Sequence, residues 1–218
     1  MTEDRVEMTI RRALLRPARP SSDFDLNHHQ ILPPGVLPKT RVLRDAGVLV
    51  AIWLRPDGAR VILTQRSPQL KHHPGQVAFA GGKVDAHDDG PIAAALREAH
   101  EEIALPPGHV EILGTLPAHE TVTGFRVLPV LGLIRGDFTP KAEAGEVAEI
   151  FTVPLSHVLD RSRYRIEERQ WQGVTRKYYT VPWGPYYIWG ATARMLRALA
   201  EQVAAEQAAG DPHPQAAR

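Results

Sequence analysis

The spacing of apolar residues along the chain predicts an alternation of strands and helices. Helical spacing covers about residues 4–15, and prolines then interrupt regular structure until about residue 41. Two apolar runs, 46–54 and 60–66, flank a Pro-Asp-Gly turn and predict a strand pair. Further strands are expected at 76–80, 110–116, 126–134, 147–153, 164–170 and 176–181.

Two more helices are predicted from apolar residues that recur every three or four positions. The first covers about 91–104, with one buried stripe made of Ile92, Leu96, Ala99 and Ile103. The second runs from Tyr186 to about Glu206, with inward-facing residues Met195, Leu196, Leu199 and Val203.

Length and composition favour a single main domain. With 218 residues, 43% hydrophobic and 23% charged, the chain can bury one substantial core. We expect this domain over 41–206, an N-terminal extension over 1–40 lying across it, and a flexible tail over 207–218. Residues 1–15 mix charged with apolar side chains, and no segment reaches membrane-spanning length. We therefore expect a cytoplasmic protein without a membrane partner.

Charge and cysteine content restrict the chemistry. The 26 basic and 25 acidic residues nearly balance and the basic ones are scattered, so we do not expect a nucleic-acid partner. The absence of cysteine excludes disulfides, thiolate catalysis and zinc sites built from sulfur. Any metal must be held by oxygen or imidazole.

Acidic residues crowd one part of the helix expected at 91–104. Glu98, Glu101 and Glu102 project within about a third of its circumference, on a different side from the apolar stripe. Like charges at these spacings repel, and a divalent cation or an arginine would relieve the repulsion. Magnesium takes a few carboxylates and fills its other positions with water and phosphate, which suits diphosphate hydrolysis. The spacing alone is equally compatible with a solvated acidic face.

Wider sequence context favours the catalytic interpretation. The run from Arg97 to Leu105, preceded by Gly81-Gly82, resembles the Nudix box, Arg-Glu-apolar-any-Glu-Glu-any-Gly-apolar. Residues 63–82 look like the signature of the coenzyme A diphosphatase branch of that family. Segments 121–125, 129–130, 146–155 and 188–193 are also similar to this branch, so the resemblance spans roughly residues 40–203.

The resemblance implies an α/β protein with the Nudix fold, an α/β/α sandwich around a mixed β-sheet. It also implies an enzyme that uses Mg²⁺ or Mn²⁺. Carried onto this sequence, the metal ligands would be Glu98, Glu101 and Glu102, with the carbonyl of Gly82 as a further candidate. Arg97 would orient a helix carboxylate by ion pairing. The general base stays open between the helix glutamates and two later residues, Glu146 and Glu149.

The sequence departs from the family pattern at four points. Ala80 and Lys71 replace a proline and an arginine of the upstream signature, and Ala104 replaces the last glycine of the box. Asp88 stands in place of the isolated glutamate of the box, with one extra residue before Arg97. The acidic residues of the helix are intact, so these departures affect the substrate assignment more than the hydrolytic chemistry.

The branch resemblance implies cleavage of coenzyme A to adenosine 3′,5′-bisphosphate and 4′-phosphopantetheine. Candidate contacts to the phosphates or the adenosine end of this nucleotide-containing small molecule are Arg66, Lys71, His73 and Gln76. For the histidine, an exposed position at a strand end is an equally good explanation.

Two alternatives remain at this stage: a Nudix hydrolase of ADP-ribose, NADH or another nucleoside diphosphate derivative, and a nucleotide sensor without catalysis. The crowded glutamates argue against a sensor. The family often forms homodimers, and the aromatic segment 183–189 is a candidate interface. We expect Trp171, Trp183 and Trp189 to serve the core or such an interface rather than adenine stacking.

Overall fold

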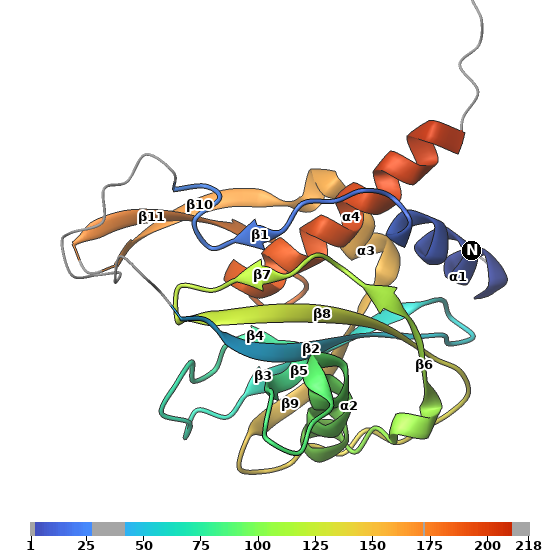
Figure 1. Cartoon of the computed structure of the whole chain (residues 1–218), viewed down its shortest axis with the longest axis horizontal. Helices are drawn as coiled ribbons and strands as arrows, with labels where there is room; N and C mark the ends of the chain where they lie inside the picture. Colours follow the sequence, from blue (N-terminus) through green and yellow to red (C-terminus); the bar gives the residue numbers. More distant parts are fainter. Residues whose placement is uncertain (1–2, 28–41, 172, 211–218) are drawn as a thin grey trace, which may run out of the picture.

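The computed structural model describes residues 3–27, 42–171 and 173–210 (Figure 1). The helices are α1 (Glu3–Leu14), α2 (Gly90–Ile103), α3 (Leu155–Leu159) and α4 (Gly190–Gly210). Single 3₁₀ turns lie at Pro107–His109 and Arg161–Arg163. The strands are β1 (Ser21–Ser22), β2 (Arg44–Trp53), β3 (Arg60–Arg66), β4 (Val77–Ala78), β5 (Ala80–Lys83), β6 (Val110–Thr115), β7 (His119–Glu120), β8 (Phe125–Ile134), β9 (Val147–Pro154), β10 (Arg165–Trp171) and β11 (Val174–Thr180).

The main sheet is mixed. Its centre is β2, which pairs in parallel with β8 and antiparallel with β3 and β5. Strand β3 also pairs antiparallel with β4 and β9, and β8 pairs antiparallel with β6 and β7. The hairpin of β10 and β11 forms a separate two-stranded sheet.

Apolar side chains are buried on both faces of the main sheet. On β2, Val50 and Ile52 pack into the core shared with α1, α3 and α4, whereas Leu49 and Ala51 pack into the core shared with α2. A strand covered on both faces needs an unbroken apolar run, which explains the composition of 46–54. Figure 1 shows α2 on one side of the sheet and the other three helices on the opposite side. The expected α/β/α sandwich is confirmed.

The buried stripe predicted for α2 is partly wrong. Ala99 and Ile103 are fully buried, but Leu96 is only half-buried and Ile92 is 39% exposed. The core face carries Ala94 and Ala95 instead. The cause is close packing of α2 on β2, because a Cβ added at Gly47 would lie 1.8 Å from the carbonyl oxygen of Pro91. At that separation only small side chains fit between helix and sheet.

The predicted start of the last helix is also wrong. A tight turn closes the chain on itself, with Trp183 and Tyr186 exchanging backbone hydrogen bonds of 3.0 and 2.9 Å. Isolated pairing between Thr180 and Trp189 extends this turn, so α4 begins only at Gly190. The inward face expected from Met195, Leu196, Leu199 and Val203 is confirmed, since all four are buried.

Part of the N-terminal segment shares the main core. Val6, Ile10 and Ala13 of α1 are buried in the same cluster as α4, and β1 pairs with β7. The remainder of the expected extension, 28–40, and residues 211–218 of the expected tail lie outside the described residues. Residues 208–210, predicted to fray, belong to α4. Among the described residues, no helix is both long and apolar enough to span a membrane.

Candidate functional site

Glycines bring α2 against the strand that carries the Gly81-Gly82 pair. A Cβ at Gly81 would lie 2.4 Å from the carbonyl oxygen of Gly47, so β5 and β2 can pair at this register only without side chains there. A Cβ at Gly82 would lie 2.4 Å from Oε1 of Glu98. The absence of a side chain at Gly82 therefore creates the space that the Glu98 carboxylate occupies.

Three carboxylates converge beside this strand. One carboxylate oxygen each of Glu98, Glu102 and Glu146 lie within 4.8 Å of one another. Glu102 is only 4% exposed, Glu98 is half-buried and Glu146 is exposed. The backbone N–H of Gly81 donates to Oε2 of Glu102 at 3.3 Å, which holds one of its two carboxylate oxygens.

The electrostatics of the cluster suit a divalent cation. Burial raises the pKa of Glu102 to about 8, and the neighbouring charge of Glu98 adds to the rise. Burial also raises the pKa of Glu98, against the opposing effect of Arg97. Carboxylates that are costly to ionise together become favourable ligands when a cation neutralises them. The residues present therefore fit a hard divalent ion with oxygen ligands.

Arg97 holds the acidic groups around it in a fixed arrangement. Its Nε and Nη2 each donate to Asp88 at 2.9 Å, and its Nη1 donates to Glu98 and Glu101 at 3.0 Å each. This fork lowers the pKa of Asp88 to about 2. Asp88 thus pairs with Arg97 from the position where the box usually has glutamate, a contact that the sequence comparison did not assign.

Glu101 does not join the cluster in this arrangement. Its side chain is 56% exposed and accepts a hydrogen bond from Nη1 of Arg97, and it is not one of the three carboxylates that lie within 4.8 Å of one another. The sequence expectation of three converging helix glutamates is therefore met by two of them, and Glu146 brings the third carboxylate from a distant loop.

The two later glutamates occupy different environments. Glu146 precedes β9 and lies at the cluster, whereas Glu149 accepts a hydrogen bond of 2.5 Å from the Tyr186 hydroxyl. Tyr186 stacks on Phe151 with ring centroids 3.6 Å apart, and Phe151 belongs to the core on the face opposite α2. Glu149 therefore points to the other side of the sheet from Glu102.

The predicted substrate-binding residues lie on the loop between β3 and β4 and at its two ends. Nη1 of Arg66, at the end of β3, lies 3.9 Å from Oε1 of Glu102. The loop is closed by hydrogen bonds between the backbone of Arg66 and those of Gln76 and Gly75. Lys71 and His73 are exposed on this loop, and Gln76 is half-buried where the loop enters β4. Arg66 and Lys71 give this loop, the cationic rim of the site, its positive charge, and Arg66 is the residue that adjoins the carboxylates.

The aromatic segment 183–189 is engaged within the chain. Trp183 contacts His157 edge-on, with ring centroids 4.7 Å apart, and Trp189 contacts Tyr178 in the same way at 5.1 Å. Tyr187 is 42% exposed. These contacts agree with a packing role for the two tryptophans.

Together, the sandwich, the glycine-rich strand and the helix carboxylates define a class of proteins that hold a divalent cation beside a cationic rim. A family model described as the NUDIX domain matches residues 44–174. The chain belongs to the Nudix hydrolase family, which confirms the expectation of a Nudix diphosphatase. Enzymes of this family generally use divalent metal ions, in agreement with the carboxylate cluster.

Relatives and solved structures support this assignment. The chain is 42% identical over 181 residues to an uncharacterized Nudix hydrolase, NudL, of Escherichia coli O139:H28, covering 83% of this chain and 94% of the relative. It is 44% identical over 181 residues to NudL of Enterobacter sp. (strain 638), covering 83% and 93%. The Nudix hydrolase RenU of M. smegmatis shares the fold, with a TM-score of 0.50, 19% identity, and coverage of 82% of this chain and 100% of that one.

Proposed function

We propose that this enzyme hydrolyses the diphosphate bond of coenzyme A or its derivatives, giving adenosine 3′,5′-bisphosphate and 4′-phosphopantetheine, with Mg²⁺ or Mn²⁺. The observation that carries the proposal is the meeting of Glu98, Glu102 and Glu146 directly beside Arg66. The carboxylates supply oxygen ligands for a cation, and the neighbouring guanidinium supplies a donor for phosphate, which are the two groups that binding of a diphosphate needs.

In the proposed site, Glu98, Glu102 and Glu146 hold the ion, and the carbonyl of Gly82 is a further candidate ligand. Glu101 becomes a ligand of the ion only if its carboxylate leaves Arg97, because Nη1 of Arg97 donates to that carboxylate at 3.0 Å. When bound, a divalent cation neutralises phosphate oxygens and makes a water acidic enough to attack phosphorus.

The surrounding residues orient the reacting groups. Arg97, fixed by the Asp88 fork, holds the Glu98 carboxylate in place, and the N–H of Gly81 fixes one oxygen of Glu102. A glutamate of the cluster accepts the proton of the attacking water. Glu149 is disfavoured for this step because its carboxylate is occupied by the hydroxyl of Tyr186 on the other sheet face.

The charge of the rim supports coenzyme A over ADP-ribose and NADH. Arg66 adjoins the carboxylates, and Lys71, His73 and Gln76 lie further along the same loop. Coenzyme A carries a 3′-phosphate in addition to its diphosphate, whereas ADP-ribose and NADH lack that group. An exposed cationic loop has most to gain from the additional charge, since arginine and lysine both bind phosphate well.

Product analysis by mass spectrometry tests the proposal. The full chain is incubated separately with coenzyme A, NADH and ADP-ribose in Mg²⁺ or Mn²⁺, with the Glu98→Gln variant as the inactive control. We expect the two named products from coenzyme A and faster turnover of it than of the other two. Preference for NADH or ADP-ribose would replace the substrate assignment, and nucleotide binding without any turnover would replace hydrolysis by sensing.

A further inference from the structure

The loop that delivers Glu146 to the cluster is fastened at both ends. On one side, the backbone N–H of Glu143 donates to the carbonyl of Glu102 at 3.0 Å. On the other side, the backbone N–H of Ser67 donates to the carbonyl of Glu146 at 2.7 Å. The loop therefore spans the gap between the end of α2 and the end of β3, where Arg66 lies.

The contact with α2 uses carbonyl groups that a helix end leaves without partners. Besides the bond from Glu143 to Glu102, the N–H of Lys141 donates to the carbonyl of Ile103 at 3.1 Å. The loop is thus attached to the same helical turn that supplies the buried carboxylate of the cluster.

The side chain of Glu143 adds a second attachment, directly to Glu146. Its Oε2 accepts the backbone N–H of Glu146 at 2.9 Å, an N–H that also reaches the Glu143 carbonyl at 3.1 Å. Acceptance of an N–H three residues ahead is the geometry with which acidic side chains cap turns and helix starts. This contact orients the peptide from which the Glu146 side chain projects.

Gly145 makes room for this contact. A Cβ at Gly145 would lie 3.0 Å from Oε2 of Glu143, which is tighter than ordinary packing, and 3.5 Å from Oε1, which is an ordinary contact. The turn therefore carries a residue without a side chain at the point where the Glu143 carboxylate folds back. Because Glu146 is exposed, few packing contacts restrict its side chain, and backbone anchoring has the larger influence on where its carboxylate lies.

We propose that Glu143 is a positioning residue, which sets Glu146 against Glu98 and Glu102 by accepting the hydrogen bond that the Glu146 amide donates to its side chain. The inference rests on the proposed function, since it takes Glu146 as a ligand of the ion. Glu143 itself acts through Glu146 and not on substrate.

The test measures binding of Mn²⁺ to the full chain, from the electron paramagnetic resonance signal of the free ion. Glu143→Ala removes the acceptor, and Glu143→Gln keeps an acceptor oxygen while removing the charge. We expect affinity for Mn²⁺ to fall roughly tenfold in the alanine variant, the low end of what the loss of a partner behind a metal ligand costs. The glutamine variant should bind within about twofold of the wild type, because the hydrogen bond survives.

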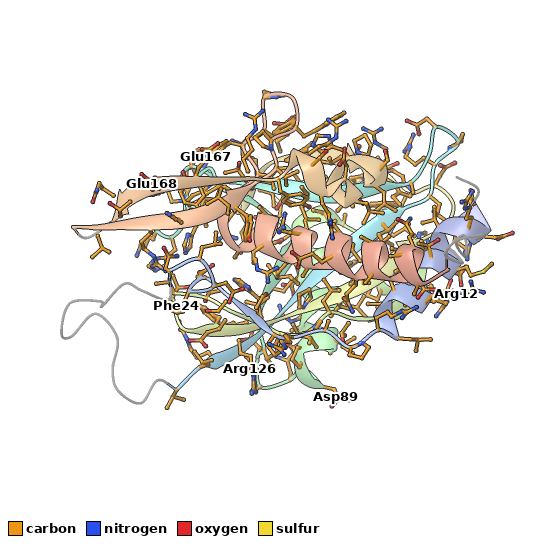
Figure 2. All side chains as sticks on the ribbon, turned by 90° about the horizontal axis from the view of Figure 1, so that it is seen from above. Arg12, Phe24, Asp89, Arg126, Glu167 and Glu168 are labelled. Atoms are coloured by element: carbon orange, nitrogen blue, oxygen red, sulfur yellow. The ribbon has the colours of Figure 1, made fainter. Side chains whose placement is uncertain are left out.

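A double-mutant cycle identifies the route of the effect. In a Glu146→Gln background, Glu143→Ala should cause no additional loss of affinity, since the residue that it positions no longer acts as a ligand. Glu168→Ala is the matched control: this glutamate is exposed on the β10 hairpin, in a separate sheet (Figure 2). It should leave affinity unchanged.

The outcomes distinguish the positioning role of Glu143 from the proposed metal site. Equal losses for alanine and glutamine at Glu143 would show that only its charge matters and would overturn positioning. An undiminished effect of Glu143→Ala in the Glu146→Gln background would overturn it as well, as would wild-type affinity in Glu143→Ala. The proposed metal site itself fails if the wild type binds no Mn²⁺, or if Glu98→Gln does not abolish the binding that the wild type shows. Thermal melts in EDTA confirm that the variants compared are folded.

Discussion

Replacing Glu102 by glutamine should stabilise the metal-free protein at neutral and alkaline pH. The carboxyl is 4% exposed, and burial raises its pKa from 4.5 to about 8. A carboxyl whose pKa is raised by folding is tolerated below its unfolded pKa, and its ionisation costs stability as pH rises toward the folded value. Glutamine has nearly the same shape, can still accept from Gly81, and cannot ionise.

The size of the effect follows from the pKa difference. At about 1.4 kcal/mol for each tenfold change in ionisation constant, a pKa raised from 4.5 to about 8 costs about 3 kcal/mol of unfolding free energy at pH 7. Above pH 8 the cost levels off at about 5 kcal/mol, and near pH 4 it vanishes. The stability advantage of Glu102→Gln over the wild type should therefore grow as the pH rises from 4 to 8.

Urea denaturation in EDTA at pH 4.5, 7 and 8.5 measures this difference. Titrating groups that do not interact with Glu102 cancel when wild type and Glu102→Gln are compared at each pH. The same measurement with saturating Mn²⁺ should reverse the order, because only the wild type gains the binding free energy of the ion. A stability difference that does not change between pH 4.5 and 8.5 would refute the reasoning, since Glu102 would then ionise normally.

Substitutions at three further positions test the geometry. Gly82→Ala would place a Cβ 2.4 Å from Oε1 of Glu98, so we expect turnover to fall at least about tenfold with the fold retained by circular dichroism. Asp88→Ala removes two hydrogen bonds from Arg97 and should lower kcat roughly 10- to 100-fold, whereas Asp88→Glu should keep more activity than alanine. Gly47→Ala would drive a Cβ into the backbone of α2 and should lower the free energy of unfolding by about 3 kcal/mol in urea denaturation; an unchanged midpoint would contradict the close packing.

Much of the fold follows from local sequence pattern. The boundaries of the strand expected at 60–66 match β3, and α1 and α2 begin and end within a residue of prediction. These elements carry strong periodicity and clear turn or proline signals. The short strands β1 and β7, two residues each, have no periodicity to detect and depend on pairing, of β1 with β7 and of β7 also with β8.

The errors arise where tertiary contacts override local preference. Ile92 looked buried because of its helical spacing, but Gly47 draws α2 so close that alanines take the inner face. The segment from Tyr186 to Trp189 looked helical, but the turn at 183–186 and pairing of Trp189 with Thr180 compete successfully for its backbone. Neither contact can be inferred from nearby residues alone.

In the candidate site, as in the fold, some features follow from the sequence and others depend on tertiary contacts. The family resemblance identifies Glu98 and Glu102, and the structure places both at the cluster. It cannot say which of Glu146 and Glu149 approaches them, because that depends on a bulge in the pairing of β3 with β9 and on the hydroxyl of Tyr186. The sequence also gives no sign of the role proposed for Glu143, apart from its position three residues before Glu146.

The most direct measurement is an anomalous difference map at the manganese absorption edge, from crystals grown in or soaked with Mn²⁺. The account predicts a peak bounded by the carboxylates of Glu98, Glu102 and Glu146, with ion-to-oxygen distances of about 2.1 to 2.3 Å. A map with manganese bound elsewhere, or with no peak among these three side chains in the presence of a coenzyme A analogue, would contradict it.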